Sequence, residues 1–197
     1  MEKFNHIELN NEVTKRGDNG FFKLEKDQEA IAEFLREVDY RTVKFSSEMK
    51  RLRYLVEENF YYNIFDKYIE DEIVECIEIA KNFKFEFKSY MAASKFYKDY
   101  ALKTNDKKQY LENFNQHVFI VAMYLGDGNT ALAKELMIAM LEQRLQPATP
   151  TFLNSGRSRR GELVSCFLLE VGDSLNSINY IDSTAKQLSK IGGGVAI

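Results

Sequence analysis

Cys166 is the residue whose type and setting most strongly suggest chemistry. It lies beside Ser165 within residues 162–171, a nearly continuous apolar run of strand length. A thiol in a closed site can donate a proton and electrons, and two such thiols can end as a disulfide. The alternative is an inert core cysteine, because free cysteine is among the most buried residue types. Burial favours a core role for Cys166, and more strongly for Cys76, which lies on the apolar face of an expected helix.

Three other segments carry groups that could hold a ligand. The glycines at 192–194 follow an expected helix, where they either cap it or let backbone approach a phosphate or sugar closely. Arg157, Arg159 and Arg160 could pair with phosphate oxygens, although such a loop is more often a solvated face. Asp173 is either a helix N-cap or a ribose-binding carboxylate. His6 and His117 have no evident partner, so we expect structural or surface roles for them.

The elements that would position these residues change character near Pro147. Before it, apolar residues recur at helical spacing, which predicts amphipathic helices. These are expected over about 28–38, 47–60, 69–81, 107–125 and from an N-cap at Asn129 to no later than Gln146. Phe83, Phe85 and Phe87 alternate with charged residues, which indicates a short extended connection. Residues 1–146 are therefore expected to form a helical domain.

Residues 147–197 predict a different structure. Two prolines exclude regular helix over 146–151, and the run at 162–171 suits a strand buried on both faces, as inside an α/β barrel. A helix capped by Asp173 or Ser174 and reaching about Lys190, then a strand from Val195, completes a β-α-β unit. A three-residue strand at a chain end cannot satisfy itself, so we expect an incomplete barrel with poor solubility beyond about Pro147.

Composition narrows the class of protein. The composition, with 45% hydrophobic and 29% charged residues, is typical of a soluble globular protein with a substantial core. No apolar run approaches the roughly 18 residues that cross a bilayer, and the N-terminus lacks a secretory h-region. Two distant cysteines favour neither a metal site nor a disulfide framework, so a reducing cytoplasm is expected. The net charge of −3 argues against broad binding to nucleic acid.

Longer motifs resemble those of one family, the class Ib ribonucleoside-diphosphate reductase large subunit. The resemblance covers essentially the whole chain. Its motifs are Gln-Pro-Ala-Thr-Pro-Thr-Phe-Leu-Asn at 146–154, Gly-Arg-Ser-Arg-Arg-Gly-Glu-Leu-Val-Ser-Cys-Phe-Leu-Leu-Glu at 156–170, Asp-Ser-Leu at 173–175 and Gln-Leu-Ser-Lys-Ile-Gly-Gly-Gly-Val at 187–195, with similar segments at 7–12 and 96–108.

The resemblance implies a mainly α chain: a helical N-terminal domain without a full ATP cone at 1–146, then, at 147–197, the first β-α-β elements of a ten-stranded α/β barrel. It implies reduction of ribonucleoside diphosphates to deoxyribonucleoside diphosphates by thiyl-radical chemistry. Cys166 matches the first of the two cysteines that supply the reducing equivalents. The motif positions that contact substrate correspond to Thr149, Ser165, Cys166 and Gly194. Those of the allosteric specificity site correspond to Asp173, Ser174 and Leu175.

The implied partners are a ribonucleoside diphosphate, a second large subunit, a thioredoxin- or glutaredoxin-like reductant and nucleoside triphosphate effectors. The radical is expected to come from a dimanganese or diiron tyrosyl cofactor of a small subunit, so that this chain itself holds no cofactor or metal. The family's radical cysteine, second redox cysteine, relay tyrosines and C-terminal cysteine tail have no counterpart in this sequence, so the chain alone is expected to be inactive. The alternatives are a non-enzymatic helical interaction module and a nucleotide-binding regulator.

Overall fold

The chain is mainly helical and divides into two compact units. The computed structural model describes residues 4–159 and 161–197. The first unit comprises Met1–Glu48 and Glu75–Phe119, and the second comprises Met49–Val74 and Ile120–Ile197. Pro147 lies inside the second unit, and the expected domain boundary at 146 and 147 stays a prediction.

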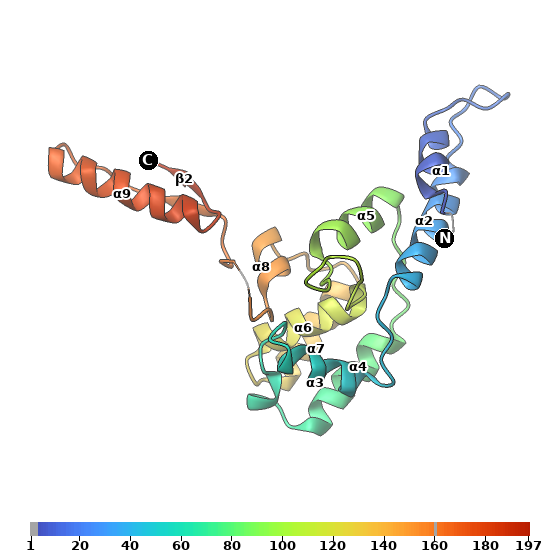
Figure 1. Ribbon diagram of the computed structural model, residues 1–197, viewed down its shortest axis with the longest axis horizontal. Coiled ribbons are helices and arrows are strands. Elements are labelled where there is room, and N and C mark those ends of the chain that lie inside the picture. The colour runs from blue at the N-terminus through green and yellow to red at the C-terminus, as the bar shows by residue number, and fades with distance from the viewer. Residues whose placement is uncertain (1–3, 160) are drawn as a thin grey trace. The chain divides into compact units, whose positions relative to one another are not determined.

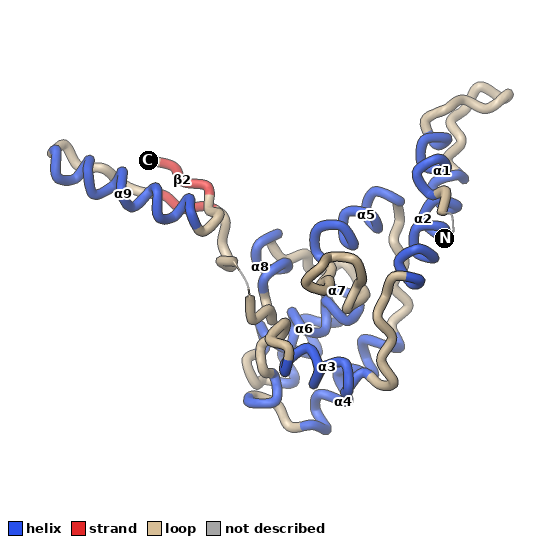
Figure 2. Tube along the Cα trace, viewed as in Figure 1, coloured by secondary structure: helices blue, strands red, loops and turns tan. Residues whose placement is uncertain are grey.

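The first unit combines helices from two separate stretches of the chain (Figures 1 and 2). They are α1 (His6–Val13), α2 (Glu25–Tyr40), α5 (Tyr90–Lys95), the π-helical turn η2 (Phe96–Tyr100), the end of α4 (Glu70–Asn82) and the start of α6 (Phe114–Gly126). Helix α2 buries Ala30, Phe34 and Val38, which share a face at four-residue spacing. The Phe34 ring meets those of Tyr90 and Tyr97 edge to face, at centroid distances of 5.7 and 6.0 Å.

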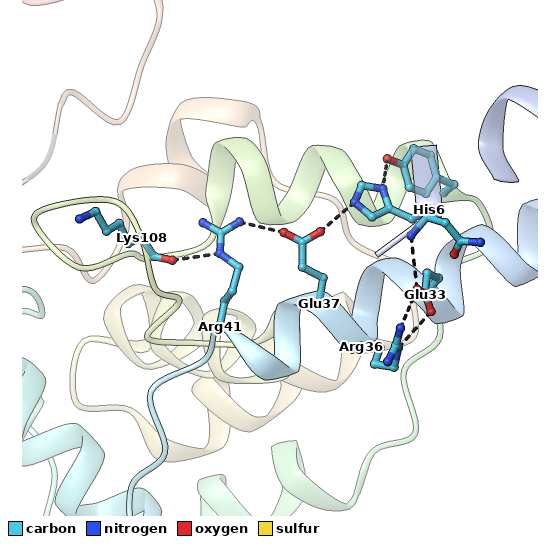
Figure 3. A network of polar contacts seen from close by, with 8 residues as sticks. His6, Glu33, Arg36, Glu37, Arg41 and Lys108 are labelled. Carbon is cyan, nitrogen blue, oxygen red and sulfur yellow. Dashed lines mark hydrogen bonds and ion pairs between the residues drawn. The ribbon is translucent and has the colours of Figure 1, made fainter. Parts of the chain in front are cut away.

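A polar network fixes α1 within this unit (Figure 3). The buried His6 ring lies 2.8 Å from Glu37 Oε2 through Nε2 and 2.8 Å from the Tyr90 hydroxyl through Nδ1. Glu37 also pairs with Arg41 at 3.2 Å, and Arg41 Nε donates to the Lys108 carbonyl at 3.0 Å. The other histidine, His117, is completely buried and lies 3.0 Å from Glu112 Oε1. Both histidines therefore have partners that the sequence did not reveal.

The second unit combines helices with a small parallel sheet (Figure 2). It contains α3 (Glu48–Glu57) from Met49 onward, the 3-10 turn η1 (Ile64–Asp66), α7 (Thr130–Leu141), α8 (Thr149–Asn154), β1 (Cys166–Leu168), α9 (Leu175–Lys190), β2 (Gly194–Ala196), the start of α4 and the end of α6. Leu52, Leu55, Ile64 and Met137 are fully buried in its core. The Asn129 side chain accepts a hydrogen bond from Leu132 N at 3.0 Å, which confirms the predicted N-cap of α7.

The predicted β-α-β unit is present. Strands β1 and β2 pair in parallel, with Cys166 opposite Gly194 and Phe167 opposite Val195, and α9 connects them. Ser174 Oγ accepts from Ser177 N at 3.1 Å and is the N-cap of α9. Gly192 follows α9 with a φ of +91°, a conformation that favours glycine. Within the described residues the sheet has two strands, so the structure shows a β-α-β unit, and the barrel stays a prediction.

Two local predictions for the C-terminal part were wrong. The strand expected over 162–171 is confined to 166–168. It is not buried on both faces: Phe167 is half-buried, whereas Cys166 and Leu168 are exposed, because no described part of the chain covers their face. Residues 149–154 form a helix although two prolines precede Thr151. Pro150 lies in the first turn of α8, where its missing N–H has no helical partner to lose.

The helix expected over 107–125 begins only at Phe114. Lys107 has a φ of +59° and donates from its backbone N–H to the Thr104 carbonyl, which closes a turn. Tyr110 then pairs with residues near Thr42 rather than continuing a helix. Residues 84–87 have no regular secondary structure, in agreement with a connecting segment. No helix among the described residues has the length and apolarity needed to cross a membrane.

Candidate functional site

Three of the predicted substrate-contacting residues lie side by side in the two-stranded sheet. Gly194 N donates to the Ser165 carbonyl at 2.7 Å, and Gly194 is the register partner of Cys166. The Ser165 hydroxyl lies 3.6 Å from Cys166 Sγ. Both side chains are exposed. The thiol is therefore neither packed in hydrocarbon nor enclosed by residues that the structure describes.

Strand alternation explains why the thiol is accessible. Successive side chains of a strand point to opposite faces, so Cys166 and Leu168 share the face opposite Phe167. Phe167 is half-buried, whereas Cys166 and Leu168 are exposed. A Cβ atom added to Gly193 would lie 2.0 Å from Phe167 Cε2, so the aromatic ring occupies the space that a side chain would need. Phe167 anchors the strand on one face and leaves the cysteine free on the other.

Helix α8 holds the segment that leads to Ser165. Thr151 Oγ1 donates to the Leu163 carbonyl at 3.1 Å, and Asn154 Nδ2 donates to the Glu162 carbonyl at 2.8 Å. Thr149, predicted to contact substrate, is the exposed first residue of this helix. No role was predicted for Thr151 or Asn154, although both belong to the motif at 146–154. Their position in that motif was the available signal.

The residues predicted for an allosteric site lie at the start of α9. The Ser174 hydroxyl oxygen serves as the helix cap, and Gly172 N donates to Ser177 Oγ at 2.8 Å. Asp173 and Leu175 are exposed on either side of this cap. Because β1 runs from Cys166 toward α9, this cluster follows the carboxyl end of β1, whereas the thiol lies at its amino end. The two predicted clusters are thus at opposite ends of the strand.

Of the three arginines at 157, 159 and 160, Arg157 has a structural role. Arg157 is buried, with its guanidinium 5.7 Å from the Tyr61 ring centroid, and buried Arg51 lies 5.9 Å from the same centroid. A solvated face is therefore the wrong interpretation for Arg157. Arg159 is exposed, and Arg160 lies outside the described residues.

Cys76 is completely buried on α4, which confirms its predicted core position. Among residues 4–159 and 161–197, no group of three or more histidine, cysteine or carboxylate side chains is arranged to hold a metal ion. Cys166 is therefore the accessible thiol of the described chain, and its immediate polar neighbour is Ser165.

Comparison with known proteins identifies the family. Residues 6–85 match the model described as ribonucleotide reductase N-terminal, and residues 86–160 match ribonucleotide reductase, all-alpha domain. The chain belongs to the ribonucleotide reductase family, and it corresponds to the N-terminal region of the large, alpha subunit.

Individual alpha subunits align over nearly the entire chain. The chain is 49% identical over 195 residues to the ribonucleoside-diphosphate reductase NrdEB subunit alpha of Bacillus subtilis, and 49% identical over 193 residues to another alpha subunit of that bacterium. It is 41% identical over 194 residues to the alpha subunit of Mycoplasma pneumoniae. These alignments cover 97–98% of this chain but 18%, 27% and 26% of the respective relatives.

Proposed function

We propose that this chain is the N-terminal part of a class Ib ribonucleoside-diphosphate reductase catalytic subunit, in which Cys166 supplies one of two reducing thiols. The observation that carries the proposal is the exposed cluster of Ser165, Cys166 and Gly194 in a chain of this family. In the overall reaction two thiols give up two protons and two electrons and become a disulfide. The ribonucleoside diphosphate loses its 2′ oxygen as water and gains hydrogen in its place.

The other residues of the cluster would bind the substrate. Hydroxyl groups such as those of Ser165 and Thr149 can both donate and accept hydrogen bonds, which suits ribose and diphosphate oxygens. The Gly194 N–H already bonds to the Ser165 carbonyl, so Gly194 would contribute space rather than a donor. The second thiol would come from a different segment, because Cys76 is completely buried on a separate helix.

The start of α9 would serve regulation. Asp173 and Leu175 are exposed at the start of a 16-residue helix. The positive end of the helix would favour the phosphates of a nucleoside triphosphate effector, and the Asp173 carboxylate would bind its ribose. The proposed assembly contains a second large subunit and a small subunit whose dimanganese or diiron tyrosyl cofactor supplies the radical. A thioredoxin- or glutaredoxin-like protein would reduce the disulfide after each turnover.

Complementation tests this function. The chain is mixed with a polypeptide that carries the remainder of the Bacillus subtilis alpha subunit, together with a loaded small subunit and a dithiol reductant. Formation of deoxycytidine diphosphate from cytidine diphosphate is then followed by chromatography. We expect turnover only when both polypeptides are present, and we expect it to fall to background in Cys166→Ser.

Cys76→Ala is the matched control, because it removes a thiol that the proposed reaction does not use. It should retain turnover. Full activity of Cys166→Ser would refute the thiol assignment, and turnover by the 197-residue chain without its complement would show that no second polypeptide is needed. Tight association of the two polypeptides with no activity in any combination would favour a helical interaction module instead.

A further inference from the structure

Two cations, Arg41 and Lys103, lie close to the ring of Tyr110 in the first unit. Three backbone segments meet there: Tyr110 bridges to Thr42 in parallel and to Lys103 antiparallel. Val43 N donates to the Tyr110 carbonyl at 2.9 Å, and Tyr110 N donates to the Arg41 carbonyl at 3.0 Å. This pairing brings Arg41 and Lys103 to one aromatic ring although they are far apart in the sequence.

Both cations are held in place. Arg41 Cζ lies 5.4 Å and Lys103 Nζ 5.5 Å from the centroid of the Tyr110 ring. Arg41 is fixed by Glu37 and by the Lys108 carbonyl, as Figure 3 shows. Lys103 Nζ donates to the Lys98 carbonyl at 2.6 Å. The positions of these charges are therefore set before any ligand arrives, which lowers the entropic cost of binding one.

The segment 95–110, which contains Tyr110, is positively charged. Residues 95–110 contain five lysines and two aspartates, a net charge of +3 in a chain whose net charge is −3. Asp99 pairs with Lys95 at 2.5 Å, and Asp106 lies 3.9 Å from Lys108. In the part of the chain that the structure describes, Lys103 and Lys107 have no carboxylate within 4.0 Å.

The pKa of Lys103 reflects this excess. Partial burial lowers it below the ordinary value, and the charges of Arg41 and Lys107 lower it further, against the opposing effect of Asp99. The folded protein therefore holds these cations together at a cost in free energy. A bound anion would remove that cost.

We propose that Arg41, Lys103, Lys107 and Lys108 form a binding site for a phosphate group. A phosphate dianion can satisfy several cations at once, whereas a single carboxylate carries one charge. The arginine offers directed N–H groups, and the lysine ammonium groups are mobile point charges that adjust to the phosphate oxygens. The turn closed by Lys107, whose φ is +59°, adjoins the fixed pair, because the Lys108 carbonyl accepts from Arg41 Nε at 3.0 Å and the charge of Lys107 acts on Lys103. The group could belong to free phosphate or to a small phosphate ester.

Nuclear magnetic resonance titration of the 197-residue chain tests the site. Inorganic phosphate, pyrophosphate and ribose 5-phosphate are added separately at constant ionic strength, with chloride as the reference anion. We expect saturable shifts of the amides at 103–110. Ester binding as strong as that of phosphate indicates recognition of the phosphate group alone, and tighter ester binding indicates a small phosphate ester as the ligand; either supports the site.

Variants locate the binding. Lys103→Gln should weaken phosphate binding at least five-fold, and Lys103→Arg should restore most of it. Lys84→Gln is the matched control, because Lys84 is an exposed lysine of the same unit outside the cluster, and it should leave binding unchanged. Equal weakening in the Lys84 variant, or binding of a polyglutamate peptide without binding of any phosphate compound, would overturn the site.

Stability provides a readout that does not depend on resonance shifts. Lys103→Gln removes repulsion, so in chloride its melting temperature should equal or exceed that of the unchanged chain. Phosphate should raise the melting temperature of the unchanged chain more than that of the variant, because a ligand stabilises the state that binds it. No phosphate dependence in either protein contradicts the proposal. The reductase activity is not involved, so the two proposals can fail separately.

Discussion

The two cysteines differ in what surrounds each sulfur atom. Cys76 has no exposed surface, whereas Cys166 lies on the open face of β1. A thiol must reach solvent to react with an alkylating reagent, and a buried thiol reacts only when the structure around it opens. We expect iodoacetamide to modify Cys166 in the folded chain and Cys76 only in denaturant, with native rates that differ more than about ten-fold.

Peptide mass spectrometry after timed quenching measures both rates. Cys166→Ser serves as the control, because it should remove the rapid modification and leave the slow one. Rapid labelling of Cys76 in that variant would mean that α4 opens readily, and slow labelling of Cys166 would mean that its face of β1 is covered in solution. Either result would contradict the arrangement of the thiols.

The candidate site was predictable only in part. The type and neighbours of Cys166 allowed both a core and a redox role, and the resemblance to reductases favoured the second. The contact between Ser165 and Gly194 depends on the pairing of β1 with β2. Residues that lie opposite each other in these strands are 28 positions apart in the sequence. Local sequence patterns predicted the β-α-β unit, but they carry little information on which residues of the two strands lie opposite each other. The burial of Arg157 was missed for the same reason, because its partner Tyr61 is remote in the chain.

At the scale of elements, helices with a wide apolar stripe or a strong cap were predictable. The caps at Asn129 and Ser174 are examples. Helix α1 was missed because its buried residue is His6, so no apolar periodicity marks it. Helix α5 spans only six residues, too few for a periodic signal. Long-range pairing of Tyr110 with residues near Thr42 also overrode the helical pattern at 107–113.

The attachment of α1 depends on the His6 ring. His6→Phe keeps a ring of similar size against Phe34 but removes the hydrogen bonds to Glu37 and Tyr90. We expect a loss of about 1–3 kcal/mol of unfolding free energy, the usual effect of leaving buried polar partners unsatisfied. Hydrogen exchange should accelerate most for the amides of α1, and urea titration gives the global effect.

Thr14→Ala is the control for this element. The Thr14 hydroxyl donates to the Asn11 carbonyl at the exposed end of α1, where water can replace it. Its loss should change stability by less than about 0.5 kcal/mol, as is typical of surface substitutions. Equal effects of the two variants would show that α1 is held by its apolar contacts rather than by the His6 network.

The stability of the whole molecule should fall at alkaline pH. Burial raises the pKa values of Tyr97, Tyr110 and Tyr90, and for Tyr97 the nearby Tyr110 and Glu112 add to the effect. An unfolded tyrosine ionises near its ordinary pKa of about 10, below the pKa of the folded phenol. Stability is therefore fully present below pH 10 and is lost as the pH rises from there toward the folded pKa.

The lowered pKa of Lys103 has the opposite effect on stability at alkaline pH. Its folded pKa is below the ordinary value, so its deprotonation adds stability as the pH rises from the folded pKa toward the unfolded one. Urea midpoints measured from pH 8 to 11 separate the two effects. Tyr97→Phe should flatten the alkaline decline, and Lys103→Gln should steepen the net decline. An unchanged slope in Tyr97→Phe would mean that this phenol ionises as readily in the folded chain as in the unfolded one.

Residues 163–197 expose apolar side chains that no other described part of the chain covers. Leu168, Leu175 and Tyr180 are 84%, 74% and 70% exposed. Complete burial of one large apolar side chain stabilises by about 1.5–3 kcal/mol, so several together favour association with another surface. We expect the purified chain to associate as its concentration rises from about 1 to 100 µM, a range typical of weak interfaces.

Sedimentation velocity at several concentrations measures this association. Leu168→Lys combined with Leu175→Lys should shift the chain toward monomer, because burying the new charges would be unfavourable. Met91→Lys is the control: Met91 is 77% exposed but lies on α5, outside residues 163–197, and its substitution should leave association unchanged. A monomer at every concentration would show that these side chains are tolerated in water individually, as scattered apolar residues are. Suppression of self-association by the complementing polypeptide would instead indicate that both partners cover the same apolar surface.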